Sequence, residues 1–192
     1  GVRYIDYYLF QNCTGLTTVT LPSTIESIQY ASFSGCSSLK NMQIPEGVTT
    51  IMDYAFKGCD SLTTVYMPDT IKSIGRSAFA HCHSLVDIDL SENLSYIPDW
   101  TFEYCRSLKK ITIPSNVSKI GDRAFWYCTS LTDVVISEGV TILGSEAFSD
   151  CTSLRKIVLP ESMTKISDCF ENCTSLESIA IPQSVTSISY RA

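Results

Sequence analysis

The sequence predicts a repeat solenoid of the α/β type, in which one short unit recurs about eight times along the 192 residues. Two observations predict this class. Cysteine recurs every 23 residues from Cys13 to Cys151, and phenylalanine keeps the same step three positions earlier, from Phe10 to Phe148. A fixed period of about 20 to 50 residues is typical of stacked repeats, so we expect each unit to form one coil of a solenoid.

The first half of each unit predicts a short β-strand. In the unit that begins at Leu108, Ile111 and Ile113 alternate with polar residues, and Pro114 follows. Alternation with period two indicates a strand that buries one face, and proline ends it. Repeated from coil to coil, these strands should form one parallel sheet.

The second half of the unit predicts a turn and a short helical or 3₁₀ segment. Val117 and Ile120 form a second apolar pair, which is followed by Gly121 and then by Ala124 and Phe125. Glycine after an apolar pair indicates a change of chain direction. Each unit should therefore fold back on itself once.

Stacking is required because a single unit cannot bury its own apolar face. We expect residues 1–192 to form one solenoid domain in which equivalent side chains of successive coils meet. Both ends of the sequence fall within a repeat, which predicts flanking repeats or caps. The last full unit lacks one residue between Ile166 and Phe170 and carries Cys169 where most units have alanine, so a tighter turn is expected there.

Charge and composition argue against two classes of partner. The formal net charge of −6 and the pI near 4.8 disfavour nucleic acid and anionic membranes, which require clustered basic residues. No run of 18 apolar residues is present, so this segment is not expected to insert into a membrane.

The cysteines and histidines predict neither a cofactor nor a catalytic site. Stacked cysteines project in parallel, so buried free thiols are favoured over disulfides, with Cys169 and Cys173 as the alternative pair. The 23-residue spacing provides no close cysteine pair for zinc. With His81 and His83 as its two histidines, the sequence shows no nucleophilic triad. We therefore expect no catalytic residues, no metal and no enzyme activity.

The outward positions of the predicted strands vary, whereas the inward positions hardly change. The candidate ligand-binding residues on this surface, expected to be the concave one, are Tyr66, Asp87, Asp89, Lys110, Thr112, Asp133 and Val135. Tyr66 would anchor a ligand, the aspartates would recognise charge, and the valines would offer an apolar surface. The alternative is that β-branched residues merely suit strands.

A second candidate surface is aromatic and lies on the opposite side. It consists of Trp100, Tyr104, Trp126 and Tyr127, which flank the phenylalanine and cysteine columns of two adjacent units. Such residues could stack on sugar rings or contact a partner protein. They could equally cover the ends of the phenylalanine column.

The consensus L-x-x-I-x-I-P-x-x-V-x-x-I-G-x-x-A-F-x-x-C resembles the BspA-like, or treponemal-type, leucine-rich repeat over nearly the whole chain. That resemblance implies a right-handed leucine-rich repeat superhelix, a segment of a horseshoe, with the parallel sheet on its concave face and short turns, strands or 3₁₀ segments on the convex side. It also implies an extracellular or cell-surface protein that binds a host, matrix or other surface protein. A glycan ligand, and a structural spacer that displays a neighbouring domain, are the alternatives.

Overall fold

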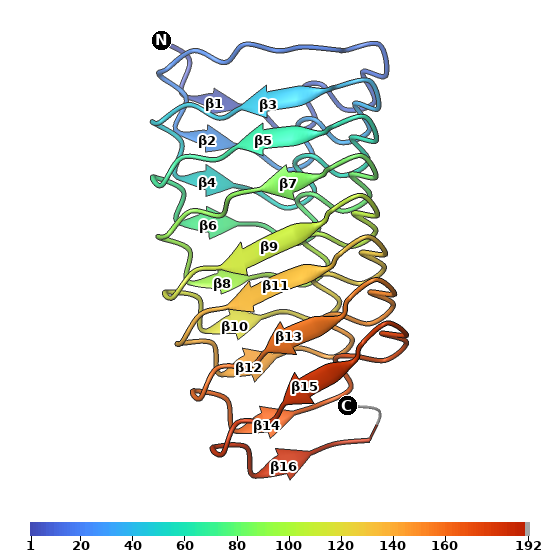
Figure 1. Ribbon diagram of the computed structural model, residues 1–192. Helices are drawn as coiled ribbons and strands as arrows, with labels where there is room; N and C mark the ends of the chain where they lie inside the picture. Colours follow the sequence, from blue (N-terminus) through green and yellow to red (C-terminus); the bar gives the residue numbers. More distant parts are fainter. Residues whose placement is uncertain (191–192) are drawn as a thin grey trace.

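The computed structural model describes residues 1–190 and shows coils stacked along one axis (Figure 1). Most coils contribute one longer and one shorter strand. The longer strands, which have three or four residues except for the two-residue β7, are β3 (Asn41–Gln43), β5 (Thr64–Tyr66), β7 (Asp87–Ile88), β9 (Lys110–Ile113), β11 (Asp133–Ile136), β13 (Lys156–Val158) and β15 (Ser178–Ala180). The shorter strands are β1 (Tyr4–Ile5), β2 (Ser27–Ile28), β4 (Thr50–Ile51), β6 (Ser73–Ile74), β8 (Tyr96–Ile97), β10 (Lys119–Ile120), β12 (Ile142–Leu143), β14 (Lys165–Ile166) and β16 (Ser187–Ile188).

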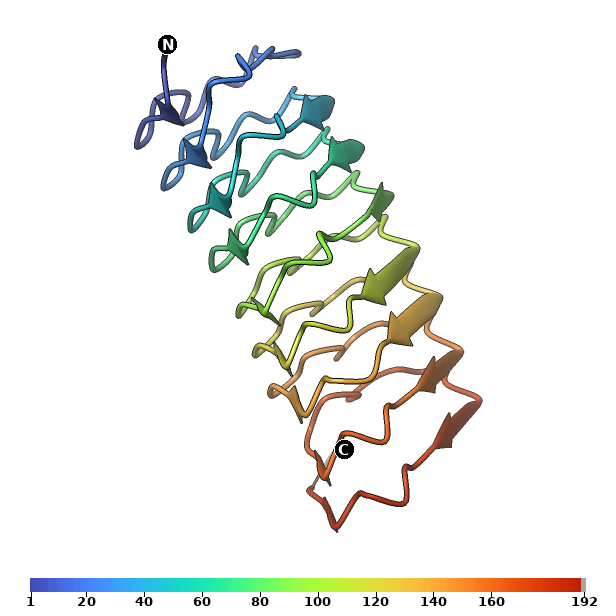
Figure 2. The ribbon, with the colours of Figure 1, turned by 90° about the vertical axis from the view of Figure 1, so that its left-hand side faces the viewer.

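The strands form two parallel ladders on different sides of the stack (Figure 2). The longer strands pair in the orders β3-β5-β7 and β15-β13-β11-β9. The shorter strands pair as β1-β2-β4-β6, β12-β10-β8 and β14-β16. Where strands pair, each pairs in parallel with the equivalent strand of an adjacent coil, as the repeat predicts, and the pairing is interrupted between β6 and β8, between β7 and β9 and between β12 and β14.

The longer strands show the burial pattern that the sequence predicts. In β9, Ile111 and Ile113 are buried, whereas Lys110 and Thr112 are exposed. Successive side chains of a strand point to opposite faces, so every longer strand sends one column inward and leaves another free.

The ladder of shorter strands is interrupted at Pro98. In two later coils, the glycine in the equivalent place donates its backbone N–H to an isoleucine carbonyl of the preceding coil: Gly121 to Ile97 and Gly144 to Ile120, both at 2.8 Å. Proline has no N–H to donate. The pairing accordingly stops between β6 and β8.

The core is a column of stacked phenylalanine rings, as the repeat predicts. The ring centroids of Phe56 and Phe79 lie 5.3 Å apart and those of Phe79 and Phe102 lie 5.6 Å apart, with nearly parallel planes. The rings from Phe33 to Phe148 are fully buried. Each ring therefore packs against its copies above and below.

The cysteine column connects adjacent coils through its thiols. Cys59 Sγ donates to the carbonyl of Phe33 at 3.2 Å, and Cys82 Sγ donates to the carbonyl of Phe56 at 3.3 Å. The cysteines from Cys36 to Cys151 are buried, and all nine are free thiols, Cys169 and Cys173 included. The prediction of buried thiols is confirmed for this column.

The expectation of helical or 3₁₀ segments is wrong for residues 1–190, so the described part is a β-solenoid rather than an α/β fold. In the segment 121–128, Arg123 and Tyr127 have positive φ angles of 53° and 60°. A helix requires consecutive right-handed residues, and these two interrupt it. Within residues 1–190 there is consequently no helix that could span a bilayer.

Alternate N–H groups of this segment bond to the next coil rather than along the chain. Phe125 donates to the carbonyl of Ala147 at 2.8 Å, whereas Trp126 donates to that of Arg123 at 3.2 Å. Every second donor thus holds two coils together. We call the stack of these segments the turn ridge; it comprises residues 6–13, 29–36, 52–59, 75–82, 98–105, 121–128, 144–151 and 167–173.

The last segment of the turn ridge lacks the position that Glu146 occupies in the preceding coil. Phe148 donates to Cys169 as Phe125 does to Ala147, so Cys169 takes the alanine place. Glu146 has a positive φ of 55°, so the missing residue is one of the left-handed ones. The shortened unit keeps the phenylalanine stack, with 6.0 Å between the centroids of Phe148 and Phe170.

Candidate functional site

The outward side chains of the longer strands form two columns, which together we call the long-strand face. The first column contains Asn41, Thr64, Asp87, Lys110, Asp133, Lys156 and Ser178, and the second contains Gln43, Tyr66, Asp89, Thr112, Val135, Val158 and Ala180. All seven residues of the first predicted site belong to these columns. Strand register therefore brings the predicted residues together on adjacent coils.

Charges alternate along the first column. Asp133 pairs in register with Lys110 on one side and with Lys156 on the other. Lys110 Nζ lies 3.1 Å from Asp87 Oδ2, with both side chains well exposed. An exposed ion pair contributes little stability, roughly 0 to 1 kcal/mol, but it holds the two side chains in place. Asp87 thus has a partner within the chain, which the sequence did not indicate.

Tyr66 and Asp89 occur together in the second column. Both line a hollow of about 140 Å³ that Gln43, Glu46 and Pro68 also border. Tyr66 is 57% exposed, so its ring is available to a partner. Asp89 is exposed and follows β7 rather than lying within it.

The later coils offer an apolar surface bordered by charge. Val135 and Val158 pair in register and are each 55% exposed. They line a hollow of about 550 Å³ together with Asp133, Lys156 and Arg155. Asp133 and Val135 are predicted site residues, and Lys156 and Val158 occupy outward positions of the same predicted surface, whereas Arg155 was not predicted.

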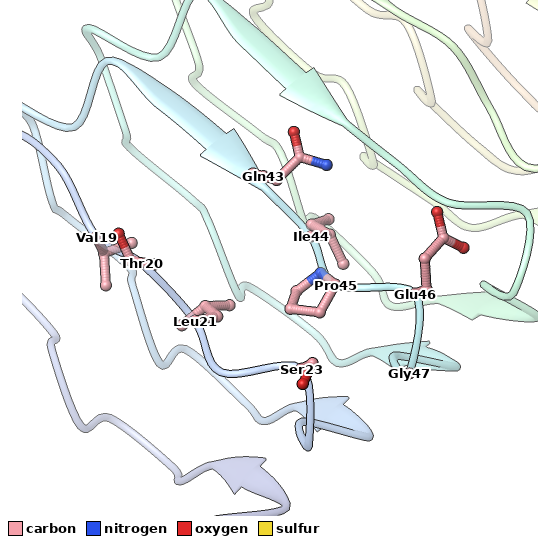
Figure 3. A pocket seen from close by; sticks show the side chains of 9 residues that line it. All are labelled: Val19, Thr20, Leu21, Ser23, Gln43, Ile44, Pro45, Glu46 and Gly47. Atoms are coloured by element: carbon pink, nitrogen blue, oxygen red, sulfur yellow. The ribbon is translucent and has the colours of Figure 1, made fainter.

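A further hollow of about 340 Å³ lies beside β3 and was missed at the sequence level. Figure 3 shows its lining side chains on two adjacent coils, at residues 19–23 and 43–47. Val19 and Leu21 remain half-buried, because their segment forms no strand against β3. The long-strand face therefore has a hollow at its N-terminal end as well.

The aromatic residues of the second predicted site lie together on the turn ridge, but they are half-buried rather than exposed. Tyr104 stacks on Tyr127 at 4.9 Å between centroids, and on the other side it stacks on His81 at 4.9 Å. Trp126 meets Tyr104 edge to face at 5.2 Å. The faces of Tyr104 are thus occupied by neighbouring rings, which leaves less ring surface to a partner, and a binding role of this patch stays a prediction.

Charged groups cover the two tryptophans. The guanidinium of Arg76 lies 3.8 Å from the ring centroid of Trp100, and that of Arg123 lies 4.9 Å from that of Trp126. Arg123 also donates two hydrogen bonds to Glu146, at 3.0 and 2.9 Å. These contacts hold successive coils together, since Arg123 and Glu146 are 23 residues apart.

Of the two histidines, His81 belongs to this ridge and His83 directly follows its segment 75–82. His83 Nδ1 lies 3.0 Å from Asp60 Oδ1. Burial lowers the pKa of His81, with Lys57 as a further cause, so its imidazole stays neutral at pH 7. Among residues 1–190, no group of three or more His, Cys, Asp or Glu is placed to hold a metal ion.

Stacked parallel strands, a buried phenylalanine column and exposed variable columns define a repeat protein of the leucine-rich solenoid class. The profile of the BspA type leucine rich repeat region matches residues 3–132 and 118–192 with six copies. The chain therefore belongs to the BspA-type leucine-rich repeat family. No protein of curated function shows significant similarity to it.

Three solved structures with a similar fold come from bacteria. The leucine-rich repeat protein TpLRR of T. pallidum is 29% identical and superposes with a TM-score of 0.77, over 80% of this chain and 72% of that one. A leucine-rich cell surface protein from Faecalibacterium prausnitzii A2-165 is 26% identical with a TM-score of 0.51, over 100% of this chain and 70% of that one. The pneumococcal vaccine antigen PcpA is 18% identical, with a TM-score of 0.52 over 86% of this chain and 50% of that one, which shows the fold alone.

Proposed function

We propose that this chain is a protein-binding module at a cell surface or in the extracellular space, and that the long-strand face binds the ligand. The observation that carries the proposal is the contrast between the inward and the outward side chains of the longer strands. Inward residues are all apolar, and from Met42 to Leu159 nearly all are buried, whereas outward ones change type from coil to coil and include Tyr66, Val135 and Val158, each more than half exposed.

The chemistry of the face suits a protein partner. Tyrosine is enriched where binding energy concentrates, and apolar groups bordered by charge resemble the centre and rim of protein interfaces. Tyr66 and Asp89 would contact the ligand on the earlier coils, and Val135 and Val158 would contact it on the later ones. Lys110, Thr112 and Asp133 lie between them, with Asp87 held by Lys110. The two regions would contact one extended ligand surface.

The cell-surface location is supported by one relative. The Faecalibacterium protein is described as a cell surface protein. That description fits an exposed repeat module. The alternative function, a spacer that displays a neighbouring domain, needs no free columns and does not explain two exposed valines in register.

The test is binding to a panel of purified extracellular-matrix proteins by surface plasmon resonance. The double variant Val135→Lys/Val158→Lys places two charges on the apolar part of the face, and we expect it to weaken binding at least about tenfold, or about 1.4 kcal/mol. Tyr66→Ala should weaken binding to a similar degree, as a loss at an anchor residue does.

Ile142→Lys is the matched control. Ile142 is 51% exposed on β12, in the ladder of shorter strands, so it tests an apolar-to-lysine change away from the face. The control should bind as the parent does. Equal affinity of all variants for a bound ligand would refute the long-strand face as the site, and the absence of any protein ligand would favour the spacer.

A further inference from the structure

The turn ridge contains a hollow of about 370 Å³ at its N-terminal end, away from the long-strand face. Its floor is formed by Ala31 and Ser34, whose side chains are small. Tyr8 and Tyr54 take the place of Ala31 in the coils before and after, and Gln11 and Lys57 take the place of Ser34. The hollow exists because one coil carries short side chains between two coils that carry long ones.

The walls are aromatic and are fixed by contacts among themselves. Tyr30 meets Tyr8 on one side and Tyr54 on the other, each edge to face with 5.3 Å between ring centroids. Edge-to-face pairs leave ring surface uncovered, unlike the stacked rings of Tyr104 and its neighbours. Tyr8 is 52% exposed.

Polar groups without partners border the same hollow. Within residues 1–190, the side chains of Gln11, Ser34 and Lys57 make no hydrogen bond or ion pair to another residue. Lys57 is half-buried, and its ammonium lies 5.4 Å from the ring centroid of Tyr54. The hollow is thus bordered by an amide, a hydroxyl and the side chain of Lys57, beside the rings of the three tyrosines.

A ligand that fits has an apolar face and several hydroxyl groups around it, which are the features of a pyranose ring. The volume lies at the lower end of the range of small-molecule sites, about 300 to 1,000 Å³. We propose that this hollow binds one pyranose unit of a glycan, with its apolar face against the tyrosine walls and its hydroxyls bonded to Gln11, Ser34 and Lys57. The site is separate from the long-strand face. It also differs from the aromatic patch around Tyr104, whose rings are covered by neighbouring rings.

Saturation-transfer difference NMR with methyl β-D-glucopyranoside and methyl β-D-galactopyranoside tests the proposal. Glucitol is the matched control ligand, because it carries similar hydroxyls but no ring. We expect saturation transfer to at least one pyranoside, strongest at the protons of its apolar face, and none to glucitol. Equal transfer to glucitol, or no transfer to either pyranoside, would overturn the proposal.

Two variants locate the binding. Ser34→Tyr fills the hollow. Trp126 occupies the equivalent place four coils further on, so a bulky ring suits this position of the repeat. It should abolish the signal. Lys57→Met keeps the apolar stem but removes the donor, which should weaken binding about fivefold, the value of one hydrogen bond.

Lys119→Met is the control for the lysine change, because Lys119 is exposed on β10 in the ladder of shorter strands. It should leave the signal unchanged. Unaltered binding in both Ser34→Tyr and Lys57→Met would refute the site. The binding of protein ligands to the long-strand face is measured separately, so the outcomes of the two proposals stay distinct.

Discussion

The long-strand face and the turn ridge follow the same coils, yet they use their side chains in opposite ways. On the long-strand face, neighbouring strands satisfy the backbone, and side chains such as Tyr66 and Val135 project freely. On the turn ridge, Trp126 donates its Nε1–H to Asp150 Oδ2 at 2.9 Å and contacts two other rings. An aromatic residue on the surface of a repeat is thus available for binding only if adjacent coils do not already engage it.

The largest expected effect concerns the thiols that anchor the turn ridge. Burial raises the pKa of Cys36 from 9.0 to about 11 and that of Cys169 to about 12. The unfolded chain therefore loses these protons at a lower pH than the folded chain does. The contribution of these thiols to the free energy of unfolding is fully present below pH 9. It falls as the pH rises from 9 through 11, by about 1.4 kcal/mol per pH unit for each such cysteine.

Urea denaturation at pH 8, 9, 10 and 11 measures this loss. The variant Cys36→Ala/Cys169→Ala should show a shallower decline. Identical slopes for the parent and the variant would show that these thiols do not control stability.

Removal of one ring from the core should have the next largest effect. Phe102 is fully buried and stacks on Phe79 at 5.6 Å and on Phe125 at 5.3 Å. Phe102→Ala should lower the free energy of unfolding by about 3 to 5 kcal/mol, as large-to-small changes in cores do. Phe102→Leu, which retains much of the volume, should cost less, and a cost below 1 kcal/mol for the alanine variant would be inconsistent with a stacked column.

A smaller effect is expected for the ion pair of the turn ridge. Arg123 makes two hydrogen bonds to Glu146, and lysine cannot reproduce this geometry. Arg123→Lys should cost about 1 kcal/mol, because the pair is partly exposed. Arg155→Lys, at an exposed position on the other side, is the matched control and should remain within about 0.5 kcal/mol of the parent.

The sequence predicted the strands, the core columns and the family, because these depend on residue type repeated in phase. It did not predict the left-handed residues of the turn ridge, since Arg123 and Tyr127 show no local preference for positive φ. One signal was present: Gly35, Gly58 and Asn172 occupy the same column as Tyr127, and glycine and asparagine tolerate this conformation.

The sequence predicted the residues of the long-strand face better than the contacts of the aromatic patch, for a related reason. Alternation within a strand identifies an outward column, so Tyr66 and Val135 were found from sequence alone. The covering of Trp100 by Arg76 and of Trp126 by Arg123 depends on contacts between coils and on side-chain directions at turns. Neither follows from residue spacing.

The most direct test of this contrast is the free energy of unfolding of Trp126→Ala compared with that of Tyr66→Ala. Trp126 loses two ring contacts, a hydrogen bond and the contact with Arg123, so we expect a cost of about 2 to 3 kcal/mol. Tyr66→Ala should cost no more than about 0.5 kcal/mol, because its ring is exposed. Equal costs for the two variants, or a larger cost for Tyr66→Ala, would contradict the assignment of stabilising contacts to the turn ridge and of free side chains to the long-strand face.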